Sequence, residues 1–191
     1  MEAGSKPRAQ FSVAGEPLDK ERSRICRKAC DYIRLTRARQ AEHSNLSQSP
    51  QPVIVLDTNV VLDWLLFADP SSRALAAAIA QGQIRWVATT AMRDELTEVM
   101  RRGLAARRNF DPAVALAGWD AMANTVDQPD PPGTPTVLHC TDPDDQKFID
   151  LAQASGARWL LSRDHAVLRL ARRAAQQNLV ITVPQGWSAP T

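Results

Sequence analysis

Acidic residues follow short apolar runs at separate places in this sequence, and they are the side chains best suited to chemistry. Asp57 comes directly after the run at 53–56, and Asp164 follows the run at 159–162. Carboxylate oxygens are preferred ligands of hard divalent cations such as Mg²⁺ and Mn²⁺, which commonly handle phosphate groups. The residues that this chemistry would use are Asp57, Glu95, Asp142, Asp144, Asp145 and Asp164.

The positions of these acids depend on strands and helices that alternate along the chain. Strand candidates cover residues 53–56, 84–89, 137–140, 159–162 and 179–183. Helical patterns cover residues 60–67, 73–80, 91–102, 112–122, 141–154 and 166–177. Strands that alternate with helices through short connections predict a parallel α/β sheet. Ligands bind outside the carboxyl ends of such strands, so we expect the acids to converge at one edge of the sheet.

Each acid also has a structural explanation. Asp57 and Asp164 are good N-caps for the helices that follow them. Acids in the first turn of a helix complement its dipole by about 0.3–1 kcal/mol, which would account for Asp142, Asp144 and Asp145. The cluster interpretation is favoured because several segments bring carboxylates to one edge, where they repel one another unless a divalent ion neutralises them.

Four segments carry a resemblance to a known family. In this order and spacing, VLDTNV, DELTEVMRR, TDPDDQKFIDLA and LLSRD resemble the PIN-domain nucleases over about residues 53–184, in particular the VapC-like toxins of toxin-antitoxin pairs. The resemblance implies a three-layer α/β/α sandwich with a central parallel sheet of about five strands. It also implies a Mg²⁺- or Mn²⁺-dependent endoribonuclease, often a homodimer bound by a small cognate antitoxin.

The resemblance also assigns roles to particular residues. By position, the catalytic and metal-binding carboxylates of the family correspond to Asp57, Glu95, Asp145 and Asp164. Asp144 replaces Asp145 as the third ligand if the alignment shifts by one residue, and Asp142 is an auxiliary candidate. Thr58 and Asn59 match the small polar pair after the first acid, where they would hold the loop and contact the scissile phosphate or a metal-bound water.

Arginines near the acids are candidates for binding RNA phosphate. Arg93 and Arg163 adjoin the acidic positions and are therefore the predicted substrate-binding arginines. A further basic strip comprises Arg101, Arg102, Arg107 and Arg108. An ordinary solvated helix face is the alternative explanation for all of these arginines, and for the strip it is the favoured one.

Charge and composition divide the chain into three parts. Residues 1–52 hold ten Lys or Arg against six acids, and we expect them to form a flexible basic N-terminal extension with one helix at about 18–40. Residues 53–184 are the expected PIN-like nuclease domain, and residues 185–191 are the expected C-terminal tail. The basic extension suggests contact with nucleic acid, although a solvated tail explains it more simply.

Composition also excludes several classes of protein. No uninterrupted apolar run approaches the roughly 20 residues that cross a membrane, and the N-terminus contains charges where a signal peptide would need an apolar stretch. Cys26, Cys30 and Cys140 match no disulfide framework, which suits a reducing compartment. The sequence therefore predicts a soluble, cytoplasmic protein without a membrane partner.

The main prediction is a metal-dependent endoribonuclease that hydrolyses RNA phosphodiester bonds, as the toxin of a type II toxin-antitoxin pair. One alternative is a PIN-like module that binds RNA or a protein partner without catalysis. Another is a phosphatase with Asp57 as its nucleophile. That class carries a second Asp two residues further on, where this chain has Asn59, so the phosphatase is the weaker alternative.

Overall fold

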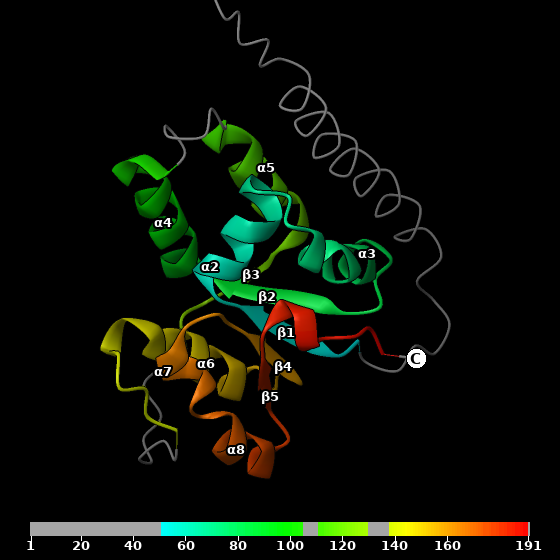
Figure 1. Cartoon of the computed structure of the whole chain (residues 1–191), viewed down its shortest axis with the longest axis vertical. Helices are drawn as coiled ribbons and strands as arrows, with labels where there is room; N and C mark the ends of the chain where they lie inside the picture. The colour runs from blue at the N-terminus through cyan, green and yellow to red at the C-terminus, as the bar shows by residue number, and fades with distance from the viewer. Residues whose placement is uncertain (1–50, 105–110, 130–137, 191) are drawn as a thin grey trace, which may run out of the picture.

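A sheet of five parallel strands lies at the centre of the protein (Figure 1). The strands are β1 (Val53–Leu56), β2 (Arg85–Thr89), β3 (Asn124–Val126), β4 (Trp159–Leu161) and β5 (Val180–Thr182). Their order in the sheet is β3-β2-β1-β4-β5, and each neighbouring pair is parallel. The computed structural model describes residues 51–104, 111–129 and 138–190. The expected N-terminal extension and its helix lie outside these residues.

Helices cover both faces of the sheet (Figure 1). One layer contains α2 (Thr58–Val61), η1 (Leu62–Leu66), η2 (Pro70–Ser72), α3 (Arg73–Ala80), α4 (Thr90–Val99), η3 (Met100–Leu104) and α5 (Pro112–Met122). The other layer contains α6 (Gln146–Ala154), α7 (His165–Leu168) and α8 (Ala171–Ala174). Short helical turns are η5 (Pro143–Asp145), η6 (Ala175–Gln177) and η7 (Pro184–Gly186). This arrangement confirms the predicted three-layer α/β/α sandwich. None of the helices in the described ranges has the length and apolar character that a membrane span requires.

One strand lies elsewhere in the chain than predicted. The prediction of a strand at 137–140 is wrong for its described part, 138–140, where the backbone is irregular. The remaining strand is β3, which begins shortly after the end of α5 and pairs with β2. The side-chain amide of Asn124 donates a hydrogen bond to the Trp86 carbonyl at 3.1 Å and so strengthens this pairing.

A side chain takes the place of a neighbouring strand beside residues 138–140. Gln146 Oε1 accepts a hydrogen bond from the Cys140 N–H at 2.8 Å, and Gln146 Nε2 donates to the Leu138 carbonyl at 3.1 Å. Leu138 is completely buried. The apolar pattern at this point therefore reports burial of a loop, which sequence periodicity cannot distinguish from a short strand.

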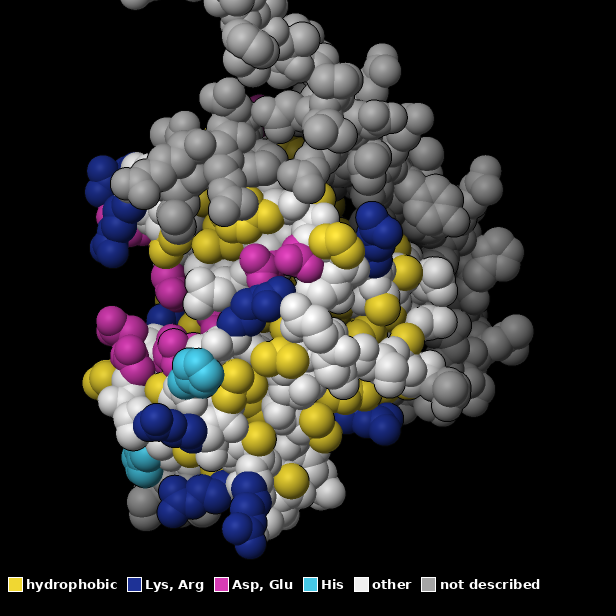
Figure 2. Space-filling view, viewed as in Figure 1, with side chains coloured by type: hydrophobic (Ala, Val, Ile, Leu, Met, Phe, Trp, Pro, Cys, Tyr) yellow, Lys and Arg dark blue, Asp and Glu magenta, His cyan; other side chains and the backbone are white. Residues whose placement is uncertain are grey.

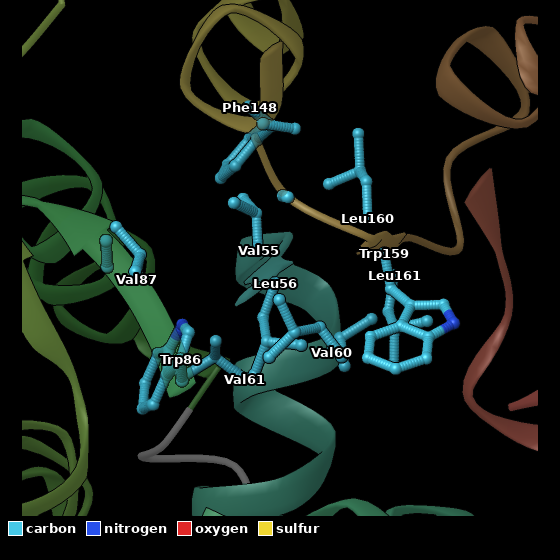
Figure 3. Close-up of a cluster of buried hydrophobic side chains, with 14 of the residues drawn as sticks. Val55, Leu56, Val60, Val61, Trp86, Val87, Phe148, Trp159, Leu160 and Leu161 are labelled. Carbon is cyan, nitrogen blue, oxygen red and sulfur yellow. The ribbon is translucent and has the colours of Figure 1, made fainter. Parts of the chain in front are cut away.

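The middle of the core forms around β1, which is buried along its whole length. Figure 3 shows Val55 directed toward Phe148 of α6. Leu56 points to the opposite face of the sheet, toward the helix that carries Val60 and Val61. Successive strand residues point to opposite faces, so a run without polar residues is what a strand covered on both sides requires.

Tryptophans extend this core in two directions. Trp86 packs against Trp64 and Trp119, with ring centroids 5.6 Å and 4.7 Å apart. Trp159 packs against Trp187, with ring centroids 5.8 Å apart. Trp187 belongs to the segment predicted as a C-terminal tail, and its burial shows that this segment contacts the sheet layer.

The edges of the sheet are β3 and β5, and each has three residues. Their side chains include Val126 and Val180, which are 38% and 46% exposed. Among the described residues these are the large hydrophobic side chains that stand out into solvent.

Candidate active site

Asp57 lies at the carboxyl end of β1 and is almost completely buried, with 2% of its surface exposed. Its Oδ1 accepts a hydrogen bond from the Asn59 N–H at 3.2 Å, so Asp57 is also the N-cap of α2. Burial is the main cause that raises the pKa of the Asp57 carboxyl. The hydrogen bonds that this carboxyl accepts oppose the shift, and the charges of Glu95 and Asp164 add to it. Asp57 is therefore a helix cap whose ionised form is disfavoured by burial.

Ser162 links the ends of β1 and β4. Its Oγ donates to Asp57 Oδ2 at 2.5 Å and accepts a hydrogen bond from the Asp164 N–H at 2.9 Å. Ser162 is completely buried and is not among the predicted site residues. The sequence places a polar residue directly after each of these two strands, and the parallel register that pairs Leu56 with Leu161 brings these residues together.

Asp164 extends this hydrogen-bonded chain to α7. Its Oδ1 accepts a hydrogen bond from the Ala166 N–H at 2.6 Å and caps the helix. Its charge raises the pKa values of both Asp57 and Asp145. Asp164, like Asp57, is therefore an N-cap and also lies near other acids.

Asp145 approaches the same place from η5. Burial raises the pKa of its carboxyl to about 6, and the charges of Asp57, Asp164 and Asp142 act in the same direction. Asp144 is exposed, and its N–H donates to Asp142 Oδ1 at 2.9 Å. This geometry favours Asp145 over Asp144 as the third acid of the candidate site.

Glu95 reaches this edge from α4 and has a cationic partner there. Lys147 Nζ lies 2.8 Å from Glu95 Oε2, and the same ammonium group donates to the backbone carbonyl of Asp144. The positive charge of Lys147 also opposes the rise in the pKa of Asp145. Lys147 is therefore a component of the acidic edge that the predicted site residues do not include.

The charges of Glu95 and Asp164 raise the pKa of Asp57, and those of Asp57 and Asp164 raise the pKa of Asp145, so these acids lie near one another at the carboxyl ends of β1 and β4. Figure 2 shows Asp and Glu side chains gathered on the side of the molecule where α4 lies above α6 and α7. In the conformation of the structure, the described residues contain no group of three or more His, Cys, Asp or Glu side chains close enough to bind one metal ion. This agrees with the hydrogen bond of Ser162 to Asp57 and the ion pair of Lys147 with Glu95, which direct both carboxylates toward protein partners.

The two predicted substrate-binding arginines are engaged within the protein. Arg93 donates two hydrogen bonds to Asp120 of α5, at 2.8 Å and 2.9 Å. Arg163 forms an ion pair with Asp63 and donates to Ser71 Oγ at 3.3 Å. An RNA phosphate would have to compete with these partners, so a substrate-binding role for either arginine stays a prediction.

The other predicted substrate residues differ in exposure. Thr58 is buried, whereas Asn59 is exposed at the start of α2 and within reach of solvent. Their roles in holding the loop and contacting phosphate stay predictions.

The predicted basic strip is partly described. Arg101 and Arg102 share Glu98, at 2.8 Å and 3.0 Å. These ion pairs hold the pKa of the Glu98 carboxyl at about 2 and reduce the local positive charge. The remaining members, Arg107 and Arg108, lie outside the described residues.

The five-stranded parallel sheet covered by helices on both faces defines a three-layer α/β protein, and a comparison of sequences identifies the family. A family model described as PIN domain matches residues 53–166. The chain therefore belongs to the PIN-domain family, whose members are generally nucleases, typically use divalent metals and act on nucleic acid. No curated protein matched the chain.

Proposed function

We propose that this protein is a Mg²⁺- or Mn²⁺-dependent endoribonuclease, with Asp57, Glu95, Asp145 and Asp164 as its catalytic carboxylates. The observation that carries the proposal is the gathering of acids from four separate segments at one sheet edge, where burial and mutual repulsion raise the pKa values of Asp57 and Asp145. Repulsion of this kind costs stability, and its location at the carboxyl ends of parallel strands, where ligands bind, supports the proposal of a cation-binding site there.

The donor set fits a hard divalent ion. Carboxylate oxygens select Mg²⁺ or Mn²⁺ over softer metals. The four catalytic carboxylates would hold the ion, with Asp142 and Asp144 as auxiliary candidates on η5. For Glu95 to join them, its carboxylate must leave Lys147, which lies on the neighbouring α6.

An ion held by Asp57, Glu95, Asp145 and Asp164 would supply a water molecule of lowered pKa and positive charge for the phosphate. The chain supplies positioning. Ser162 fixes one carboxylate oxygen of Asp57 and the backbone of Asp164, so the two acids keep a constant separation. Thr58 and Asn59 lie directly beyond Asp57 and are the candidates to orient the scissile phosphate, together with Arg93 and Arg163.

Metal-dependent cleavage of RNA tests this proposal. The purified protein is incubated with single-stranded and structured RNA in Mg²⁺, in Mn²⁺ and in EDTA, and we expect cleavage only with metal. Asp57→Asn should reduce the rate at least about a hundredfold, since a ligand of the ion is lost. Asp94→Asn, on the exposed side of α4 beside Glu95, is the matched control and should cleave normally. Cleavage that persists in EDTA or in Asp57→Asn contradicts the proposal, and RNA binding without cleavage supports the non-catalytic alternative.

We further propose that the protein is the toxin of a type II toxin-antitoxin pair, acting in the cytoplasm as a homodimer under control of a small antitoxin. The resemblance of the four site segments to toxin nucleases supports this finer assignment. Induced expression should arrest growth, and expression of Asp57→Asn should not. Nuclease activity without growth arrest would reject the toxin assignment and leave the nuclease assignment intact. Sedimentation of the purified chain tests the dimer separately.

A further inference from the structure

Basic side chains line the exposed side of the helical segment from α7 to α8. The exposed residues are His165, Arg169, Arg172 and Arg173. The buried residues are Val167, Leu170 and Ala174. Both sets recur at helical spacing, so the apolar set anchors the segment on the core and the basic set forms one solvent-facing surface. We call His165, Arg169, Arg172 and Arg173 the α7–α8 basic face.

This face begins at the acidic edge. Asp164, one of the proposed catalytic acids, caps α7 with its side chain, and its backbone carbonyl accepts from the Leu168 N–H at 3.0 Å. The Arg169 N–H donates to the His165 carbonyl at 3.1 Å, so the helical path continues directly away from the acid. Figure 2 shows Lys, Arg and His side chains below the acidic group, over α7 and α8.

The arginines of this face differ from the other arginines near the edge in their partners. Arg93, Arg101, Arg102 and Arg163 each pair with an acid. For Arg169, Arg172 and Arg173, the described parts of the chain supply no ion-pair partner, and their charges face solvent. Within the described part of the chain, the arginines beside the acids that lack an ion-pair partner thus lie on α7 and α8, whereas Arg101 and Arg102 of the predicted strip are paired with Glu98.

We propose that the α7–α8 basic face binds the phosphate backbone of single-stranded RNA and leads the strand to Asp57 and Asp164, an inference that rests on the proposed nuclease function. The acidic edge alone repels a polyanion, so a substrate needs cationic contacts close by. Arginines along one helix face contact successive phosphates without reading bases, because phosphate contacts position a strand and base contacts specify it. The face therefore provides affinity and direction for RNA of any sequence.

The salt dependence of RNA binding tests this inference. The binding of a fluorescein-labelled single-stranded RNA is measured by anisotropy over a series of salt concentrations in EDTA, where the acidic edge adds no attraction. We expect Arg169→Gln with Arg173→Gln to weaken binding about tenfold and to reduce the slope of log K against log salt by about 1.4, the value for two phosphate contacts to a single strand. Both side chains are exposed, so the melting temperature should stay within about 1 °C of wild type.

The matched control is Arg85→Gln with Arg158→Gln. This pair removes the same charge at the start of β2 and just before the start of β4, so at the amino ends of the strands and away from the acids. This pair should keep the affinity and slope of wild type. Equal losses in the two double variants would show that net charge alone matters and would overturn the inference. Unchanged binding in the α7–α8 variant would overturn it too. So would poly-glutamate that displaces the labelled RNA as effectively as unlabelled RNA does, a result that would assign the face to an acidic protein. Loss of cleavage in Asp57→Asn is a separate result, so the nuclease proposal and this inference can fail independently.

Discussion

The ammonium group of Lys147 lies 2.8 Å from the carboxylate of Glu95 and joins α6 to α4 at the edge where the other acids meet. The positive charge of Lys147 thereby opposes the rise in the pKa of Asp145 that burial and the neighbouring acids cause. The same contact occupies a carboxylate that a divalent ion would use. Under the proposed function, Lys147 and the ion would compete for Glu95.

Replacement of this lysine should separate the two effects. We expect Lys147→Gln to bind Mn²⁺ roughly two- to fivefold more tightly in calorimetric titrations, the range that an ion pair of this exposure contributes. In EDTA the same variant should melt at a lower temperature than wild type, because the acids lose their internal counter-charge. Lys147→Arg keeps the charge and is the control. Weaker Mn²⁺ binding by Lys147→Gln would mean that Lys147 assists the ion instead of competing with it.

The hydrogen bond of Ser162 to Asp57 gives a second prediction. Ser162→Ala leaves a buried carboxylate oxygen without its donor, which should lower the free energy of unfolding by about 1–3 kcal/mol. Ser72→Ala is the matched control, since Ser72 is buried to the same degree and its Oγ has no hydrogen-bond partner in the described residues. Urea unfolding of both variants makes the comparison. Equal losses would show that the hydroxyl of Ser162 contributes no more than its volume.

The raised pKa of Asp145 predicts how stability without metal depends on pH. The folded protein holds the proton of this carboxyl up to a pKa of about 6, whereas its usual value is 3.8. The stability that comes from this proton is complete below the usual value and is lost as the pH rises through about 6. The shift of Asp57 acts in the same direction.

Melting curves in EDTA across this interval check the sign. Asp145→Asn cannot titrate, so its melting temperature should fall less than that of wild type between acid and neutral pH. It should also exceed the wild-type value at neutral pH, because a repelling charge has been removed. Parallel curves for the two proteins would contradict the assignment of the shift to Asp145.

Gln146 gives a prediction about the loop that replaces the expected strand. Gln146→Ala removes two hydrogen bonds to the backbone of residues 138–140 and should cost about 1–3 kcal/mol. Amide hydrogen exchange at Cys140 should accelerate, since its N–H loses the acceptor. Gln153, on the same helix as Gln146, forms a hydrogen bond with Gln177 at the surface. Gln153→Ala should therefore lower the free energy of unfolding by about 0.5 kcal/mol or less. A Cys140 amide that stays protected in Gln146→Ala would show that another group holds the loop.

The sheet was predictable to the extent that its strands are continuous apolar runs. The run at β1 is buried on both faces, and apolar residues also mark β2, β4 and β5, although Arg85 of β2 and Val180 of β5 are exposed. β3 has the sequence Asn-Thr-Val and is largely exposed, so no hydrophobic pattern marks it. The buried Leu138 produced a strand-like pattern in a loop, because burial and not strand geometry shapes such patterns.

The acidic site was predictable where it depends on topology alone. Asp57 and Asp164 follow strands, and parallel strands bring their carboxyl ends to one edge. Ser162 and Lys147 were missed because their partners are distant in sequence, 105 residues away in the case of Ser162 and Asp57. Which rotamer a lysine adopts and which acid it meets follow from packing, and a single sequence does not record packing.

The shortness of the two edge strands bears on how the protein avoids aggregation. β3 and β5 each expose a valine, and an exposed apolar edge strand is a template for joining another sheet. With three residues apiece, these edges offer too few backbone donors and acceptors to hold a foreign strand firmly. The short length of these strands thus has the effect that charged residues or prolines have in longer edge strands. An insertion that lengthened β5 would create an edge prone to aggregation.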